Sequence, residues 1–166
     1  MFEQRDAKRQ VQVSVPKTRL GVDTLEWTVQ SERAGYVCVA LAGSDNQSLY
    51  LLFPNDLDPN NRIEAGQPLQ MPRPNWRVRA AGPVGEEKLL VLVSVGPRDL
   101  TPLAASKAGP FISSLNDAKG LAQLGALMST SRMVISQECG GATGRKNNPL
   151  CSAAYGAALF SVGEVQ

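Results

Sequence analysis

The sequence predicts a mainly β protein, and two observations carry that prediction. Residues 11–95 contain short runs in which apolar side chains alternate with polar ones, and turn-forming residues separate these runs. The 166-residue chain also holds 11 prolines and 15 glycines, which suit short strands joined by turns better than long helices. We therefore expect an immunoglobulin-like β-sandwich of about seven to nine strands, with one short helix in the C-terminal half.

The length of the chain is that of one domain, which can bury a core without disulfide or metal staples. Residues 1–10 are polar and lack the apolar segment of a signal peptide, so we expect a disordered or artificial tail there. The single β-sandwich domain is expected at 11–166, with its central part at about 20–96 and a C-terminal elaboration at 97–166. No run approaches the roughly 20 apolar residues that span a bilayer.

The charge balance and the absence of histidine exclude several classes of function. The chain has 17 basic and 15 acidic residues, a balance that does not favour nucleic acid or a membrane surface as a partner. Without histidine, Ser–His and Cys–His nucleophiles and histidine-ligated metal sites are excluded. The sequence therefore indicates no cofactor, and an enzyme would have to use carboxylates, Lys, Tyr or a bare Cys.

Several runs before residue 96 have the pattern of strands. Leu25, Trp27 and Val29 share one face of an alternating run, and GYVCVALA at 35–42 is apolar throughout, as in a central, well-buried strand. The segment 44–47 (SDNQ) has the composition of a hairpin turn. We expect strands at 11–15, 24–30, 35–42, 48–53, 68–72, 75–81 and 88–95.

The pattern changes after Gly96-Pro97, and 97–111 has a loop-like composition. Residues 113–128 are expected to form the helix, with Ser114 and Asp117 as its capping box. Two internal glycines weaken this helix by up to about 1 kcal/mol each relative to Ala, so it must dock on the rest of the fold. Its apolar face would hold Leu121, Leu124 and Leu127 or Met128. Further strands are expected at 131–138 and 153–162.

The polar segment 54–66 is a candidate recognition loop between two strands. Its oxygen-bearing side chains resemble a calcium loop, but an EF-hand counted from Asp56 needs Gly and Glu where the chain has Asn61 and Gln67. Turn chemistry, in which Asn and Asp side chains bond their own backbone, is therefore favoured over an ion site or a protein contact. The candidate recognition residues are Asn55, Asp56, Asp58, Asn60 and Arg62.

Two basic segments are further candidates for contacts. Arg77 and Arg79 share one face of an expected strand with Trp76 adjacent, which makes a candidate contact strip, although a solvated face is the favoured reading. Arg145 and Lys146 could contact an anion at the tip of a loop. That glycine-rich loop lacks the residue spacing of a phosphate-binding P-loop, so a solvated tip is favoured.

The cysteines indicate a disulfide bond and a buried thiol. Cys139 and Cys151 flank residues 140–150, and expected strands on both sides could bring them within bonding distance. Closing a loop of about 13 residues would stabilise the fold by about 3 kcal/mol in the chain-entropy model. Such a bond favours an oxidising compartment, whereas two free thiols remain the alternative. Cys38 lies in an apolar run and is expected to be a buried free thiol.

A set of short motifs carries a family resemblance. It consists of Gly35 and Tyr36, LFPN at 52–55, AGQ at 65–67, and GEE at 85–87 followed by an apolar strand. Over about 20–96 the chain resembles an uncharacterised bacterial accessory domain of the "LFPN" type, a domain of unknown function. The resemblance implies a place at the C-terminal end of bacterial serine/threonine kinases, some associated with type VI secretion, or beside caspase-like and envelope modules. It assigns no catalytic residues.

These observations predict a non-catalytic binding or sensor domain, periplasmic or otherwise extracytoplasmic, within a longer membrane-anchored or secreted protein. Its partner would be a protein of the bacterial envelope or secretion apparatus, with no nucleic acid bound and no membrane insertion by this domain. One alternative is a structural or secreted component of an envelope secretion machine. Another is a carboxylate-based hydrolase that uses Asp56, Asp58 or Glu64.

Overall fold

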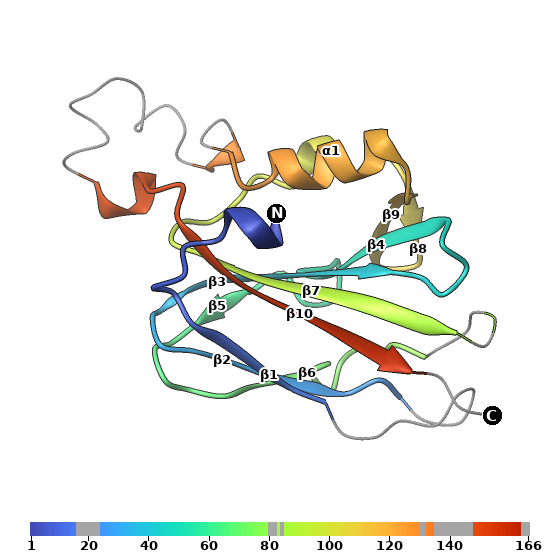
Figure 1. Ribbon diagram of the computed structural model, residues 1–166, viewed down its shortest axis with the longest axis horizontal. Coiled ribbons are helices and arrows are strands. Elements are labelled where there is room, and N and C mark those ends of the chain that lie inside the picture. The colour runs from blue at the N-terminus through green and yellow to red at the C-terminus, as the bar shows by residue number, and fades with distance from the viewer. Residues whose placement is uncertain (16–23, 80–82, 84, 130–131, 135–147, 164–166) are drawn as a thin grey trace.

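A computed structural model describes residues 1–15, 24–79, 83, 85–129, 132–134 and 148–163 of the chain. Within these residues, ten strands form two sheets, and one α-helix lies on the outer face of the larger sheet (Figure 1). The small sheet, the large sheet and the helix thus form three layers. The expected mainly β, sandwich-like architecture is confirmed, with one strand more than the upper end of the expected seven to nine.

The large sheet is antiparallel throughout and has the order β10-β7-β3-β4-β9-β8, with β5 pairing beside β4 on β3. Its two longest strands, β7 and β10, are neighbours and pair over nine residues. Glu86 pairs with Gly163 at one end, and Ser94 pairs with Tyr155 at the other. The strands are β3 (Gly35–Ala42), β4 (Ser48–Phe53), β5 (Arg62–Ile63), β7 (Glu86–Ser94), β8 (Lys107–Ala108), β9 (Phe111–Leu115) and β10 (Tyr155–Gly163).

The small sheet has the order β1-β2-β6 and faces the large one. It consists of β1 (Val11–Ser14), β2 (Trp27–Ser31) and β6 (Leu69–Met71). Strand β2 points Trp27 and Val29 inward, as their alternation with polar residues predicts, and both side chains are buried. They pack against Val37 and Val39 of β3 and Val91 of β7 to form the core between the sheets.

A second core lies on the opposite face of the large sheet. Cys38 and Ala40 of β3 and Leu92 of β7 face the helix side, because side chains of a strand alternate between its two faces. Helix α1 (Ala118–Ala126) covers them, mainly through Leu124 and through Leu127 just beyond its last turn. Strands β3 and β7 are therefore buried on both faces, which is why their sequences are nearly continuous apolar runs.

A bulge in β4 places apolar side chains in both cores. Val39 pairs with Phe53 and Ala40 with Leu51, so Leu52 is the extra residue. Because the bulge shifts the alternation, Leu52 and Phe53 both lie in the core between the sheets, whereas Leu51 faces the helix. The apolar end of the expected strand 48–53 thereby contributes side chains to both cores. The predicted turn at 44–47 is confirmed, with Asp45 Oδ1 accepting the backbone N–H of Gln47 at 2.9 Å.

Helix α1 begins later than the sequence indicates. Residues 111–115 form strand β9, in which Ser114 pairs with Leu49 and Ser113 with Tyr50 of β4. The predicted cap at Ser114 is therefore wrong, because Ser114 lies in a strand that pairs with β4 and not at the start of the helix. The cap is Asp117, whose Oδ1 accepts the N–H of Gly120 at 2.8 Å. The face prediction is confirmed for Leu124, Leu127 and Met128, but Leu121 is 50% exposed.

One further expected strand is replaced by an isolated bridge in the described residues, and another lies mostly outside these residues. Of the expected strand 75–81, the structure describes 75–79, which make only one isolated bridge, between Arg79 and Thr24. A turn at Arg73–Trp76, closed by a backbone bond of 3.2 Å, diverts this segment from the sheet. Of the expected strand 131–138, only 132–134 are described, and Met133 makes a single bridge with Arg98.

The described residues also form the short 3₁₀ helices η1 (Phe2–Gln4), η2 (Thr101–Leu103) and η4 (Pro149–Cys151). Residues 1–10, expected to be a tail, contain η1, and Met1 and Phe2 pack against the helix-side core. The N–H of Asp6 donates to the carbonyl oxygen of Tyr155 at 2.9 Å, so this segment lies along the start of β10.

The docking of α1 on β9 predicts opposite effects for its two internal glycines. A Cβ at Gly120 would overlap the carbonyl oxygen of Leu115, whereas a Cβ at Gly125 would have Met1 Cγ as its nearest neighbour at 4.0 Å. We expect Gly120→Ala to lower the free energy of unfolding by about 1–3 kcal/mol. Gly125→Ala should raise it by up to about 1 kcal/mol, because Ala favours the helix. Urea unfolding of both variants measures the difference, and equal effects would contradict this packing.

Candidate functional site

The LFPN motif at 52–55 forms a closed turn at the end of β4. Asn55 is 8% exposed and its Nδ2 donates to the carbonyl oxygen of Leu52 at 2.8 Å. Its Oδ1 accepts the backbone N–H groups of Leu57 and Asp58, both at 3.0 Å. The Asn side chain therefore satisfies the backbone of its own turn, as the turn-chemistry reading of this segment expects.

Asp58 joins this turn to the segment that precedes the β7 strand. Its side chain is 6% exposed, and Oδ1 accepts from Arg73 Nη1 at 2.6 Å. Oδ2 accepts from the indole Nε1 of Trp76 at 3.0 Å. Arg73 also donates to the carbonyl oxygen of Asn60 at 2.9 Å. A buried carboxylate is tolerated only with such partners, so these bonds hold the two segments in one arrangement.

Trp76 lies at the centre of an aromatic cluster in the core. Its ring stacks on Phe53 with centroids 6.1 Å apart, and it meets Trp27 and Phe111 edge-on at 6.2 and 5.8 Å. The candidate contact strip is therefore divided, because Trp76 is buried whereas Arg77 and Arg79 are exposed.

The other candidate residues of the recognition loop lie on the surface. Asp56 pairs with Lys107 of β8 at 2.6 Å, and Arg62 pairs with Glu64 at 2.9 Å. Asn60 accepts the backbone N–H of Arg62 at 3.3 Å. The three carboxylates of the hydrolase hypothesis, Asp56, Asp58 and Glu64, thus each face a different basic side chain instead of forming a joint acid–base pair.

Several predicted residues fall outside the described part of the chain. Arg145, Lys146 and Cys139 do so, and the Cys139–Cys151 disulfide stays a prediction. Cys151 is buried and packs with Met133. Cys38 is a buried free thiol, as expected. Burial raises the pKa of Cys38 to about 12, outweighing the opposing effects of the Arg98 charge and a hydrogen bond from Asn61.

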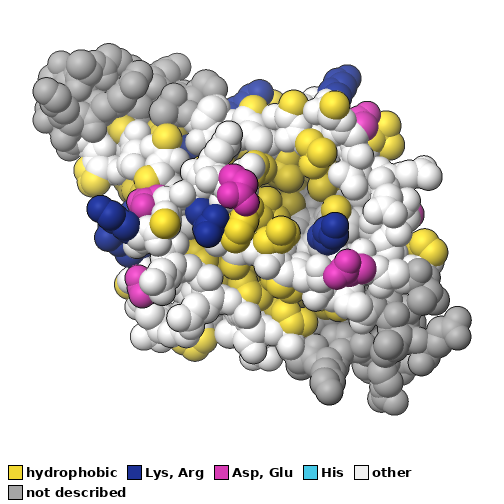
Figure 2. All heavy atoms as spheres, in the orientation of Figure 1, with side chains coloured by type: hydrophobic (Ala, Val, Ile, Leu, Met, Phe, Trp, Pro, Cys, Tyr) yellow, Lys and Arg dark blue, Asp and Glu magenta, His cyan; other side chains and the backbone are white. Residues whose placement is uncertain are grey.

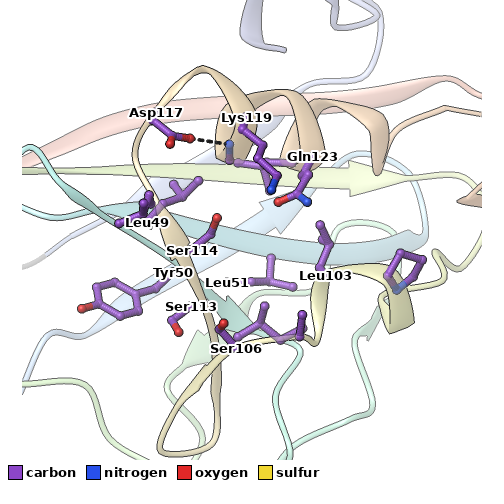
Figure 3. Close-up of a pocket in the computed structure, with 16 residues that line it drawn as sticks. Leu49, Tyr50, Leu51, Leu103, Ser106, Ser113, Ser114, Asp117, Lys119 and Gln123 are labelled. Carbon is purple, nitrogen blue, oxygen red and sulfur yellow. Dashed lines mark hydrogen bonds between the residues drawn. The ribbon is translucent and has the colours of Figure 1, made fainter.

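A cleft of about 420 Å³ lies between α1, strands β4 and β9, and the segment after η2 (Figure 3). Leu49 and Leu51 of β4 and Ile112 of β9 provide its apolar floor. Leu103 of η2 and Leu124 of α1 add apolar surface to its two walls. This volume falls within the range of about 300–1,000 Å³ that is typical of ligand sites.

Polar side chains from three elements surround this apolar floor. Lys119 and Gln123 are one turn apart on α1, and Figure 3 shows both reaching over the strands. Ser114 of β9 and Ser106 of the facing segment add hydroxyl groups. Asp117 lies at the rim, with one carboxylate oxygen used by the helix cap. The cleft can therefore hold an apolar group and bind polar or anionic atoms at its edge.

No local pattern in the sequence indicates this cleft. Its walls come from 102–106, within a segment predicted to be a loop, and from 112–124, most of which is predicted to be helical. The apolar pair Phe111-Ile112, followed by a second capping residue at Asp117, is the signal that could have separated β9 from α1. Even so, the pairing of β9 with β4 joins residues more than sixty positions apart, such as Leu49 and Ser114, which local patterns do not report.

The described residues contain no group of three or more Cys, Asp or Glu side chains placed to hold a metal ion. In the same part of the chain, no helix has the length and apolar character needed to cross a membrane. The cleft combines an apolar floor with polar side chains and is therefore the candidate functional site.

The fold and the cleft define a sandwich-like β-domain with a groove on its helix-covered face. Residues 17–97 match the model of a family described as a domain of unknown function, DUF4384. This finding confirms the resemblance at that general level and lies close to the expected 20–96. No curated protein and no solved structure gives a significant match. The matched segment ends before η2, β9 and α1, which supply most of the residues that line the cleft.

Two ion pairs of the polar loop, Asp58–Arg73 and Asp56–Lys107, should differ in their effect on stability. Asp58→Ala leaves Arg73 and the Trp76 indole without their buried acceptor, so we expect the free energy of unfolding to fall by about 2–4 kcal/mol. Asp56→Ala removes only the exposed pair with Lys107 and should cost less than about 1 kcal/mol. Urea unfolding followed by tryptophan fluorescence compares them. A cost for Asp58→Ala as small as that for Asp56→Ala would show that Asp58 does not fasten the loop.

Cys38 predicts a loss of stability at alkaline pH. Its pKa is about 12 in the folded protein against an ordinary value of about 9, so unfolding releases a proton between these values. The contribution of Cys38 to stability is complete below pH 9 and falls as the pH rises toward 12, by up to about 1.4 kcal/mol per pH unit. Urea unfolding from pH 8 upward should show a steeper decline for the wild type than for Cys38→Ala. Parallel curves would contradict the prediction.

Proposed function

We propose that this chain is a non-catalytic recognition domain that binds a segment of a partner protein in the cleft beneath α1. The single observation that carries the proposal is the combination of an apolar floor with convergent polar groups in a space of about 420 Å³. The walls of the cleft are built on a helix and on two paired strands, which hold such groups more rigidly than free loops do.

The chemistry of the cleft favours a particular kind of segment. An apolar side chain would occupy the floor formed by Leu51 and Ile112. Lys119 would then meet a carboxylate or carbonyl oxygen of the ligand, and the amide of Gln123 can both donate to and accept from its backbone. The proposed ligand is thus an extended protein segment with one apolar anchor next to an acidic or carbonyl group.

The biological setting of the proposal rests on the family resemblance and on the predicted disulfide. We propose an extracytoplasmic domain of a bacterial serine/threonine kinase or of an envelope protein associated with type VI secretion. The DUF4384 match supports the domain family without indicating its setting. A disulfide between Cys139 and Cys151 would favour an oxidising compartment.

Blocking the cleft tests the proposal. Gln123→Trp would place an indole over the cleft, whereas Ala122→Trp adds the same group about 100° around the helix, on an exposed surface outside the cleft. In pull-downs from bacterial envelope extracts, quantified by mass spectrometry, we expect Gln123→Trp to reduce the captured partner at least about tenfold. Ala122→Trp should capture as much as the wild type.

The matched pair of variants also defines the opposing outcome. If both variants capture the same proteins in the same amounts as the wild type, the cleft is not the recognition site. Circular dichroism of both variants shows that the fold is intact, so that a loss of capture is attributable to the cleft.

A further inference from the structure

The outer edge of β10 is an unusual feature of the large sheet. In the described part of the chain this strand pairs along one side only, with β7, over all nine residues. The segment YGAALFSVG contains no charged residue and no proline. Natural proteins usually shorten, charge or cover such edges, because open backbone groups readily pair with another strand.

The backbone groups that face outward can be identified from one hydrogen bond. The carbonyl oxygen of Tyr155 accepts the N–H of Asp6, so Tyr155 points its backbone groups away from β7. Because these groups alternate along an antiparallel strand, Ala157, Leu159, Ser161 and Gly163 also face outward. Asp6 occupies the edge at Tyr155. Among the described residues, 157–163 has no strand paired on this side, and we call it the free stretch.

The side chains along this free stretch are apolar and partly open. Leu159 is 51% exposed on the helix side of the sheet, and Phe160 is partly buried on the other side. Figure 2 shows hydrophobic side chains gathered across the middle of this face, where Figure 1 places β7 and β10. A hollow of about 370 Å³ separates the 157–159 part of the edge from residues 2–12, which leaves room beside the strand.

We propose that β10 pairs with β10 of a second copy of this chain, antiparallel and about a two-fold axis at Phe160. The free stretch 157–163 has Phe160 as its midpoint, so this register uses every outward-facing residue of both strands. Leu159 then lies opposite Ser161 of the second copy, and Ala157 lies opposite Gly163 of the second copy. The two large sheets become one continuous sheet, an association that adds to the proposed cleft function without requiring it.

This register suits the side chains of the strand. The two Phe160 rings meet across the axis as a non-hydrogen-bonded pair, the closest kind of cross-strand pair. The two half-exposed Leu159 side chains become diagonal neighbours on the helix side and cover each other. No like charges face each other, because the strand carries none. These features favour a second copy over a charged or proline-rich segment of another protein.

Sedimentation equilibrium of the 166-residue chain tests the proposal. The wild type should show a reversible monomer–dimer equilibrium. Leu159→Lys should raise the dimer dissociation constant at least about tenfold. The substitution removes the apolar contact between the two Leu159 side chains and places two positive charges near each other across the axis. Leu121→Lys is the matched control, since Leu121 is 50% exposed but lies on α1, and it should leave the constant unchanged.

A double variant tests the register itself. Leu159→Lys combined with Ser161→Glu sets each introduced lysine opposite an introduced glutamate of the second copy, so association should recover toward the wild-type value. A wild type that stays monomeric at every concentration would overturn the proposal. Equal weakening by Leu159→Lys and Leu121→Lys would overturn it as well, and failure of the double variant to recover would overturn the register centred on Phe160.

Discussion

The central strands β3 and β7 carry apolar side chains on both faces, and this is the constraint on which the other layers depend. Burying one such side chain fully is worth about 1.5–3 kcal/mol, so neither face can be left to solvent. The small sheet covers one face through Trp27 and Val29, and α1 covers the other through Leu124 and Leu127. The helix is therefore a required third layer of the fold, although it lies outside the segment that matches the DUF4384 family.

The polar loop after β4 has the composition of a ligand-binding site, but its buried polar side chains stabilise the fold. Asp58 bonds Arg73 and Trp76, which lie fifteen and eighteen residues further along the chain. The buried Asp58 carboxylate requires these partners. Its bond to the Trp76 indole in turn helps to hold that ring against Phe53. The LFPN motif thus has a physical explanation: two core residues, a chain-stopping proline, and an Asn that closes the turn from which Asp58 reaches its partners.

Both candidate surfaces lie where a covering layer ends. Helix α1 approaches β9 closely at Gly120, and the cleft opens along the flank of the helix that carries Lys119 and Gln123. At the opposite edge of the large sheet, the N-terminal segment contacts the start of β10, where Asp6 bonds Tyr155 and Arg9 lies against Gly156. The cleft and the edge of β10 are at opposite ends of the strand order, so a domain could bind a partner segment and a second copy at the same time.

The sequence by itself determined the elements whose signals are local. Period-two alternation and turn residues located β3 at 35–42 to the residue, the turn around Asp45, and most of β4, β7 and β10. The tertiary structure alone decided that Ser114 belongs to a strand, that Trp76 enters the core, and that Asp58 bonds Arg73. Each of these depends on contacts between residues that are distant in sequence, and such contacts produce no periodic pattern along the chain. The cleft is built from the same long-range pairings, and for that reason it could not be predicted from the sequence.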